Sequence, residues 1–72
     1  DPMERFVYIE GYAHTGNWQQ AKQLSETTLA VTGVMKPPLC QLWKRIDRET
    51  PLSIEKAEVI SQIYDLLSCS SE

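Results

Sequence analysis

The middle of this 72-residue chain holds the side chains best suited to contacting an anionic partner. They are Lys36, Gln41, Lys44, Arg45 and Arg48. Residues 36–48 carry a net charge of +3, whereas residues 1–35 carry −2 and residues 49–72 carry −4, which gives the whole chain −3. An acidic chain that gathers its cations in one short element predicts that this element faces an anion, with lysine and arginine on phosphates and glutamine at a base edge. The alternative is a solvated helix face whose arginines pair with Asp47, Glu49 or the acidic segment that follows.

Residue types that support catalysis or metal binding are sparse. His14 is the single histidine, and we identify no carboxylate or cysteine partner for it nearby in the sequence. The chain has no glycine-rich phosphate loop, no nucleophile motif and no paired acid and base. One histidine and two distant cysteines do not make a structural zinc site. We therefore predict a protein that is not an enzyme and that uses neither a metal nor a cofactor.

Aromatic side chains offer a second kind of binding chemistry. Trp43 falls on an apolar stripe and is expected in the core, where large aromatic side chains contribute most to burial. Trp18 directly follows a helix cap, so it either closes the bundle or stands exposed as an anchor for a partner. Tyr8 and Tyr12 lie four residues apart and either line a partner-binding groove or pack against the last helix.

The two cysteines favour a reducing compartment. Cys40 and Cys69 are too few and too irregularly placed for the disulfide framework of a small secreted domain, so we expect reduced thiols in the cytoplasm or nucleus. No apolar run approaches the roughly 20 residues needed to cross a bilayer, so no membrane association is expected.

Length and composition predict one small domain over residues 1–72. A chain of this length is near the lower limit for a self-sufficient core. Asp1-Pro2 before Met3 suggests that the native chain starts at Met3 or that residues 1–3 are disordered, and residues 68–72 are predicted to form a frayed tail. A nearly complete protein of this size suits a small regulator or adaptor, while a domain excised from a longer chain remains the alternative.

The first half of the chain predicts two helices separated by a turn. Residues 4–13 have both strand-like and helix-like features, and we favour a helix because no partner strand is visible. Asn17 is a suitable N-cap, with Gln20 placed for a capping box. The next helix should reach Val31 and end at Thr32-Gly33 with glycine in a left-handed conformation. Its expected inner face consists of Trp18, Ala21, Leu24 and either Thr28 or Leu29.

The second half predicts two amphipathic helices. A helix begins at Lys36-Pro37-Pro38, where the missing proline amide is tolerated, and its buried stripe is Leu39, Leu42, Trp43 and Ile46. Either Thr50 or Ser53 caps a last helix that reaches Leu67. Its expected inner face is Ile60, Ile63, Tyr64 and Leu67, with Ile54 and Ala57 one turn earlier. The fold class is therefore all-α, a compact helix-turn-helix-like bundle of four short helices, or five if the second helix breaks near Ser25.

One resemblance covers about residues 20–68. The motif residues are Leu29-Ala30, Thr32-Gly33-Val34, Leu39, Leu42 and Trp43-Lys44-Arg45-Ile46. They resemble the two central helices of the Cro and phage-repressor helix-turn-helix family. The resemblance implies a DNA-binding transcriptional regulator, often a homodimer, whose recognition helix spans about residues 37–48. Gln41, Lys44 and Arg45 would then face the DNA.

A second resemblance covers residues 12–31. The motif residues are Tyr12, Gly16-Asn17-Trp18, Ala21 and Leu29. Their spacing is similar to a tetratricopeptide-type helical hairpin, although no second copy is visible downstream. This resemblance implies the alternative function, a non-enzymatic adaptor that binds another protein through an aromatic-lined surface containing Tyr8, Tyr12 and Trp18.

Overall fold

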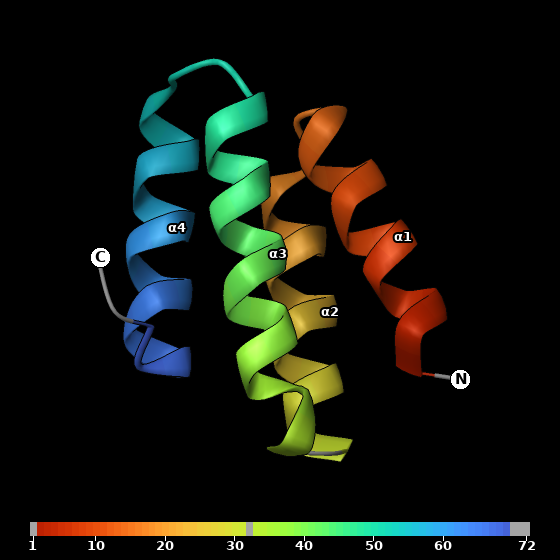
Figure 1. The fold of residues 1–72 in the computed structure, drawn as a ribbon. Helices are drawn as coiled ribbons and strands as arrows, with labels where there is room; N and C mark the ends of the chain where they lie inside the picture. The colour runs from red at the N-terminus through yellow and green to blue at the C-terminus, as the bar shows by residue number, and fades with distance from the viewer. Residues whose placement is uncertain (1, 32, 70–72) are drawn as a thin grey trace.

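The computed structural model describes residues 2–31 and 33–69, and this part of the chain folds into four α-helices (Figure 1). They are α1 (Pro2–His14), α2 (Trp18–Val31), α3 (Lys36–Glu49) and α4 (Ile54–Leu67), with a 3-10 turn η1 (Gly33–Met35) before α3. The predicted all-α bundle is confirmed. The ambiguous first segment is a helix, and α2 continues without a break through Ser25.

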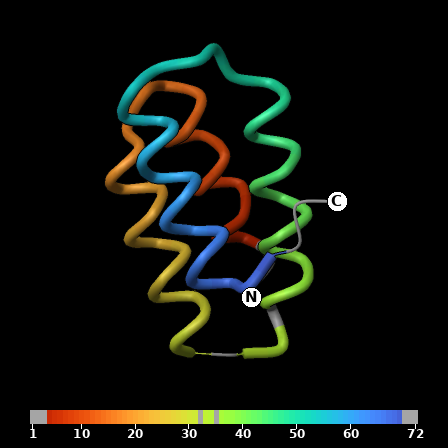
Figure 2. Tube along the Cα trace, turned by 90° about the vertical axis from the view of Figure 1, so that its left-hand side faces the viewer, coloured from red at the N-terminus to blue at the C-terminus, as the bar shows by residue number. Residues whose placement is uncertain are grey.

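The four helices form two helical hairpins laid side by side. α1 packs against both α2 and α3, and α4 also packs against both α2 and α3. The views in Figures 1 and 2 show α2 and α3 at opposite corners of the bundle, with successive helices running in opposite directions. The neighbouring pairs α1–α3 and α2–α4 are therefore parallel. α2 and α3 run antiparallel to each other across the bundle.

The two hairpins have matching dimensions. α3 ends 35 residues after α1, and α4 begins and ends 36 residues after α2. The sequence of the second hairpin does not repeat the motif of residues 12–31.

Apolar side chains from all four helices make one core. It consists of Ile9, Ala13, Trp18, Ala21, Leu39, Leu42, Trp43, Ile46, Val59, Ile60, Ile63 and Leu67. The predicted stripe on α3 is confirmed completely. The predicted inner face of α4 is partly wrong: Ile54 is 82% exposed and Ala57 is also exposed, while Val59 and Lys56 are buried. Ile54 lies about two and a half turns before Ile63, which places it on the outer face of α4, whereas Lys56 in the same turn faces the core.

Two tryptophans join the hairpins at the centre of the core. The indole N–H of Trp43 donates to Ser25 Oγ at 2.9 Å, and Ser25 in turn donates to the Ala21 carbonyl. The rings of Trp18 and Trp43 lie 6.3 Å apart, a normal spacing for a tilted aromatic pair. Trp18 is only 5% exposed. It therefore closes the bundle and offers no face to a partner, which corrects the prediction that it could anchor one.

A buried lysine organises the connection between α3 and α4. Ser53 is the N-cap of α4 and accepts a hydrogen bond from the Lys56 backbone amide, as one of the two sequence alternatives predicted. The Lys56 ammonium donates to the carbonyls of Asp47 and Thr50 and pairs with the Asp47 carboxylate at 3.2 Å. It thereby satisfies carbonyls that the end of α3 leaves without helical partners.

The structure corrects three expectations, which concern the two cysteines and the residues that follow α2 and α4. Cys40 and Cys69 form a disulfide, so the predicted reduced thiols are wrong and a reducing compartment no longer follows from them. Ser68 is a left-handed cap whose N–H bonds to α4 carbonyls, so the frayed tail does not begin there, and residues 70–72 lie outside the described residues. Gly33 begins the 3-10 turn η1 instead of a left-handed cap, and Thr32 lies outside the described residues.

Candidate functional site: the groove between α1 and α3

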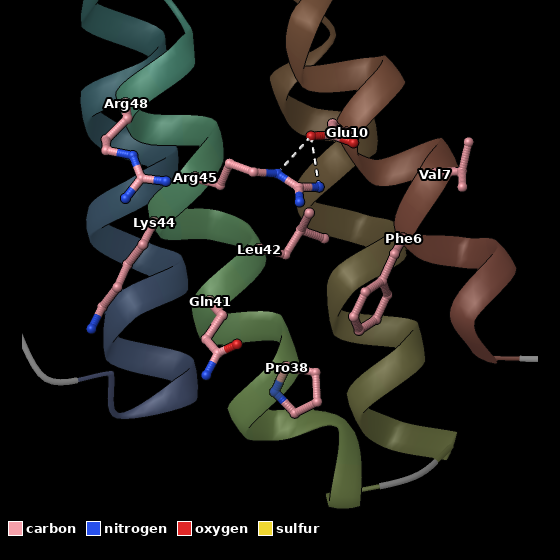
Figure 3. A pocket seen from close by; sticks show the side chains of 9 residues that line it. All are labelled: Phe6, Val7, Glu10, Pro38, Gln41, Leu42, Lys44, Arg45 and Arg48. Atoms are coloured by element: carbon pink, nitrogen blue, oxygen red, sulfur yellow. Dashed lines mark hydrogen bonds and ion pairs between the residues drawn. The ribbon is translucent and has the colours of Figure 1, made fainter.

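A groove of about 610 Å³ runs between the two parallel helices α1 and α3 (Figure 3). α1 contributes three of its side chains, and α3 contributes the others. The lining consists of Phe6, Val7, Glu10, Pro38, Gln41, Leu42, Lys44, Arg45 and Arg48. Helical periodicity explains this set, because residues three or four apart lie on one face of a helix. The groove exists because α1 and α3 are neighbours in the bundle.

The groove has an apolar floor and one apolar wall. Leu42 is buried and points towards α1. The half-buried ring of Phe6 lies in the groove beside Leu42 (Figure 3). Val7 is 69% exposed on the outer edge of α1. These side chains, together with Pro38 at the start of α3, leave apolar surface in contact with water.

An ion pair bridges the groove. Arg45 donates from Nη2 and from Nε to the same oxygen of Glu10, Oε2, at 2.8 and 3.0 Å. The side chains remain 48% and 31% exposed, so water screens this pair and its contribution to stability is below about 1 kcal/mol. Glu10 is thus the carboxylate that the structure places against the predicted cationic face.

The predicted cationic set is brought together on one side of α3, with one exception. Gln41, Lys44, Arg45 and Arg48 all line the groove, whereas Lys36 is a half-buried residue at the start of the helix outside the lining. The sequence alternative had the arginines pairing with Asp47, Glu49 or the last helix. Arg45 pairs instead with Glu10 on α1, which is 35 residues away. Only the α1–α3 contact reveals this partner, so no local sequence signal could have found it.

The predicted aromatic surface does not assemble. Tyr8 is 61% exposed, so it does not pack against the last helix. Tyr12 lines a separate shallow depression with residues of α2. Trp18 belongs to the core. The three aromatic residues therefore form no common surface, and neither tyrosine belongs to the groove.

His14 has partners that the sequence did not suggest. Its Nε2 lies 3.6 Å from a carboxylate oxygen of Glu49 at the end of α3. One ligand atom each from Glu10, His14 and Glu49 lie within 4.8 Å of one another, close enough to consider a metal ion. Glu10 is already held by Arg45 and all three residues keep contact with water. We therefore interpret this group as two polar surface contacts between α1 and α3, Arg45 with Glu10 and His14 with Glu49.

No protein-family model matches the chain, and no curated protein or solved structure is significantly similar to it. In the described part of the chain, no helix has both the length and the apolar character required to cross a membrane.

Proposed function

We propose that this protein is a non-catalytic interaction module that binds a segment of another protein in the groove between α1 and α3. The observation that carries the proposal is the lining of the groove, which combines an apolar floor with a polar and cationic rim. Protein interfaces commonly have this composition, with apolar contact at the centre and polar groups around it. Catalysis would need a different set of groups, such as a nucleophile next to a base.

The surrounding fold supports this proposal. Two stacked helical hairpins hold α1 and α3 parallel, and the buried indoles of Trp18 and Trp43 lie between the hairpins. A rigid groove binds a flexible segment at lower entropic cost than a groove that must first be ordered. The resemblance of residues 12–31 to a tetratricopeptide-type hairpin agrees with a role in protein binding.

Selection from a random 12-residue peptide library, followed by amide chemical-shift mapping, tests the proposal. We expect enriched peptides to shift residues of the groove and to lose binding in Val7→Asp, which places a charge on the apolar wall. Ser61→Asp, at an exposed site on α4, should bind as the wild type does. Shifts confined to other faces, or equal loss in both variants, would show that the groove is not the binding surface.

Binding to duplex DNA is the second candidate, because exposed Gln41 and Arg48 line one side of α3 together with Lys44 and Arg45. It ranks second because a phosphate backbone gains nothing from the apolar floor of the groove. DNA binding predicts that affinity falls steeply with salt and that Arg48→Glu abolishes it. A titration with mixed duplex DNA at low and moderate salt measures both, and an unchanged amide spectrum at low salt would rule this candidate out.

A further inference from the structure

We infer that Glu10 occupies the position on Arg45 that a carboxylate of the partner takes in the complex. Glu10 therefore competes with the partner for Arg45. The partner is accordingly an acidic segment that also carries a bulky apolar side chain. This inference rests on the proposed function, because it identifies the chemistry of what the groove binds and the intramolecular contact that must be displaced.

The geometry of the Arg45–Glu10 pair supports the competition. Both guanidinium donors converge on a single oxygen of Glu10, which leaves the second carboxylate oxygen without a part in this contact. An arginine binds a carboxylate more strongly when two donors meet two oxygens in parallel. A partner's carboxylate that approaches from the groove can adopt the two-oxygen geometry. The half-exposed guanidinium is accessible to it without unfolding any helix.

The neighbours of Arg45 determine the rest of the ligand. Arg48 lies one turn further along α3 on the groove side, and Lys44 also lines the groove, so the α3 rim is cationic. Leu42 and Phe6 provide the apolar floor about one turn in the other direction. A segment that places acidic residues along α3 and one large apolar residue between Phe6 and Leu42 would satisfy both features at once.

An acidic protein segment fits these features better than a nucleic acid. Phosphates would match the cationic rim, but they would leave the floor formed by Phe6 and Leu42 without an apolar contact. Peptide side chains provide carboxylates and apolar groups on the same chain, so the binding of one reinforces the binding of the other. DNA therefore serves as the competing outcome in the experiment.

Fluorescence anisotropy with matched peptides tests the inference. The probe is a labelled 12-residue peptide of aspartate and glutamate around one leucine and one phenylalanine; the control peptide carries asparagine and glutamine at the acidic positions. We expect the acidic peptide to bind more tightly. Glu10→Gln should tighten its binding about two- to fivefold, since an exposed ion pair is worth no more than that. Arg45→Gln should weaken it at least as much.

The double variant provides the decisive comparison. If Glu10 acts by occupying Arg45, Glu10→Gln should have much less effect when Arg45 is already glutamine. Glu58→Gln on α4 removes the same charge from an exposed site outside the groove lining, and it should change affinity far less than Glu10→Gln. Circular dichroism melts of each variant establish that the fold is retained.

Three results would overturn the inference. They are equal binding of the neutral and acidic peptides, a Glu10→Gln effect that persists undiminished in the Arg45→Gln background, and tighter binding of a duplex DNA than of the acidic peptide. The first two leave the proposed function standing if chemical shifts still map a library-selected peptide to the groove. Failure of every selected peptide to shift groove residues would remove the proposed function as well.

Discussion

The indole of Trp43 depends on a single buried hydroxyl. Its N–H donates to Ser25, and both side chains are fully buried. Ser25→Ala should lower the free energy of unfolding by about 1–3 kcal/mol, because a buried donor loses its partner. Urea denaturation measures this change. Thr27→Ala is the matched control, because this exposed threonine on the same helix donates to the Gln23 carbonyl of α2. An equal loss in both variants would mean that the indole hydrogen bond contributes little.

Tyr64 gives the protein a specific response to alkaline pH. Burial, and secondarily the nearby carboxylate of Asp47, raise the pKa of the Tyr64 phenol above its ordinary value of 10.0. Because the folded-state pKa exceeds the unfolded one, the unfolded chain releases this proton first, and the free energy of unfolding falls as pH rises past about 10.

The Tyr64→Phe variant isolates this effect. Between about pH 9 and about pH 11 the wild type should lose more stability than the variant, because only the wild type has this phenol to ionise. The ring-carbon chemical shift of Tyr64 against pH gives the pKa directly. A midpoint at or below 10.0, or the same loss of stability in both proteins, would contradict the prediction.

At the scale of the helices, the start of α4 depends on its cap. Ser53 accepts the Lys56 amide, a contact typically worth about 1 kcal/mol. Ser53→Ala should therefore destabilise the protein by about that amount in chemical denaturation. Ser61→Ala, in the exposed middle of the same helix, should be neutral or slightly stabilising because alanine has the better helix propensity. Similar losses in the two variants would exclude a special role for the cap.

The helices themselves were largely predictable because their signals are local. Proline at the start of α3, the 3.6-residue spacing of Leu39, Leu42 and Trp43, and Ser53 before α4 all act within one or two turns. One error could have been avoided from helix spacing alone. Ile54 lies about two and a half turns before Ile63, on the outer face of α4, so it is exposed although its residue type suits a core.

At the scale of the whole molecule, the disulfide ties the end of the chain to α3. Cys40 and Cys69 are separated by 29 residues in sequence. Breaking a cross-link that closes a loop of this size should cost about 2–4 kcal/mol of unfolding free energy. Thermal and chemical unfolding with and without a reductant measure the loss, and mass spectrometry counts the thiols that are released.

The Cys69→Ala variant provides the control for reduction. It should match the reduced wild type in stability and should not respond to reductant. A wild type whose stability is unchanged after both thiols are shown to be free would contradict a stabilising role for the cross-link. The groove should keep its shape in either form, because Cys40 does not belong to its lining.

The candidate site was predictable only in part. The sequence identified Gln41, Lys44, Arg45 and Arg48 as one polar face, because helix periodicity alone places them together. It did not identify the opposite wall of the groove. Phe6, Val7 and Glu10 join the site through the packing of α1 beside α3, and that packing depends on contacts between residues more than 30 positions apart.

Local sequence determined the helices of this protein, the buried stripe of α3 and the concentration of positive charge on its other side. Those features follow from chain stereochemistry and from interactions within a few residues. Only the tertiary structure decided that the two hairpins stack with parallel helices, that Trp18 is buried, that Cys40 meets Cys69 and that Glu10 holds Arg45. Each of these depends on which surfaces pack together, and many pairings of amphipathic helices bury similar apolar area, so side-chain fit across the whole core selects among them.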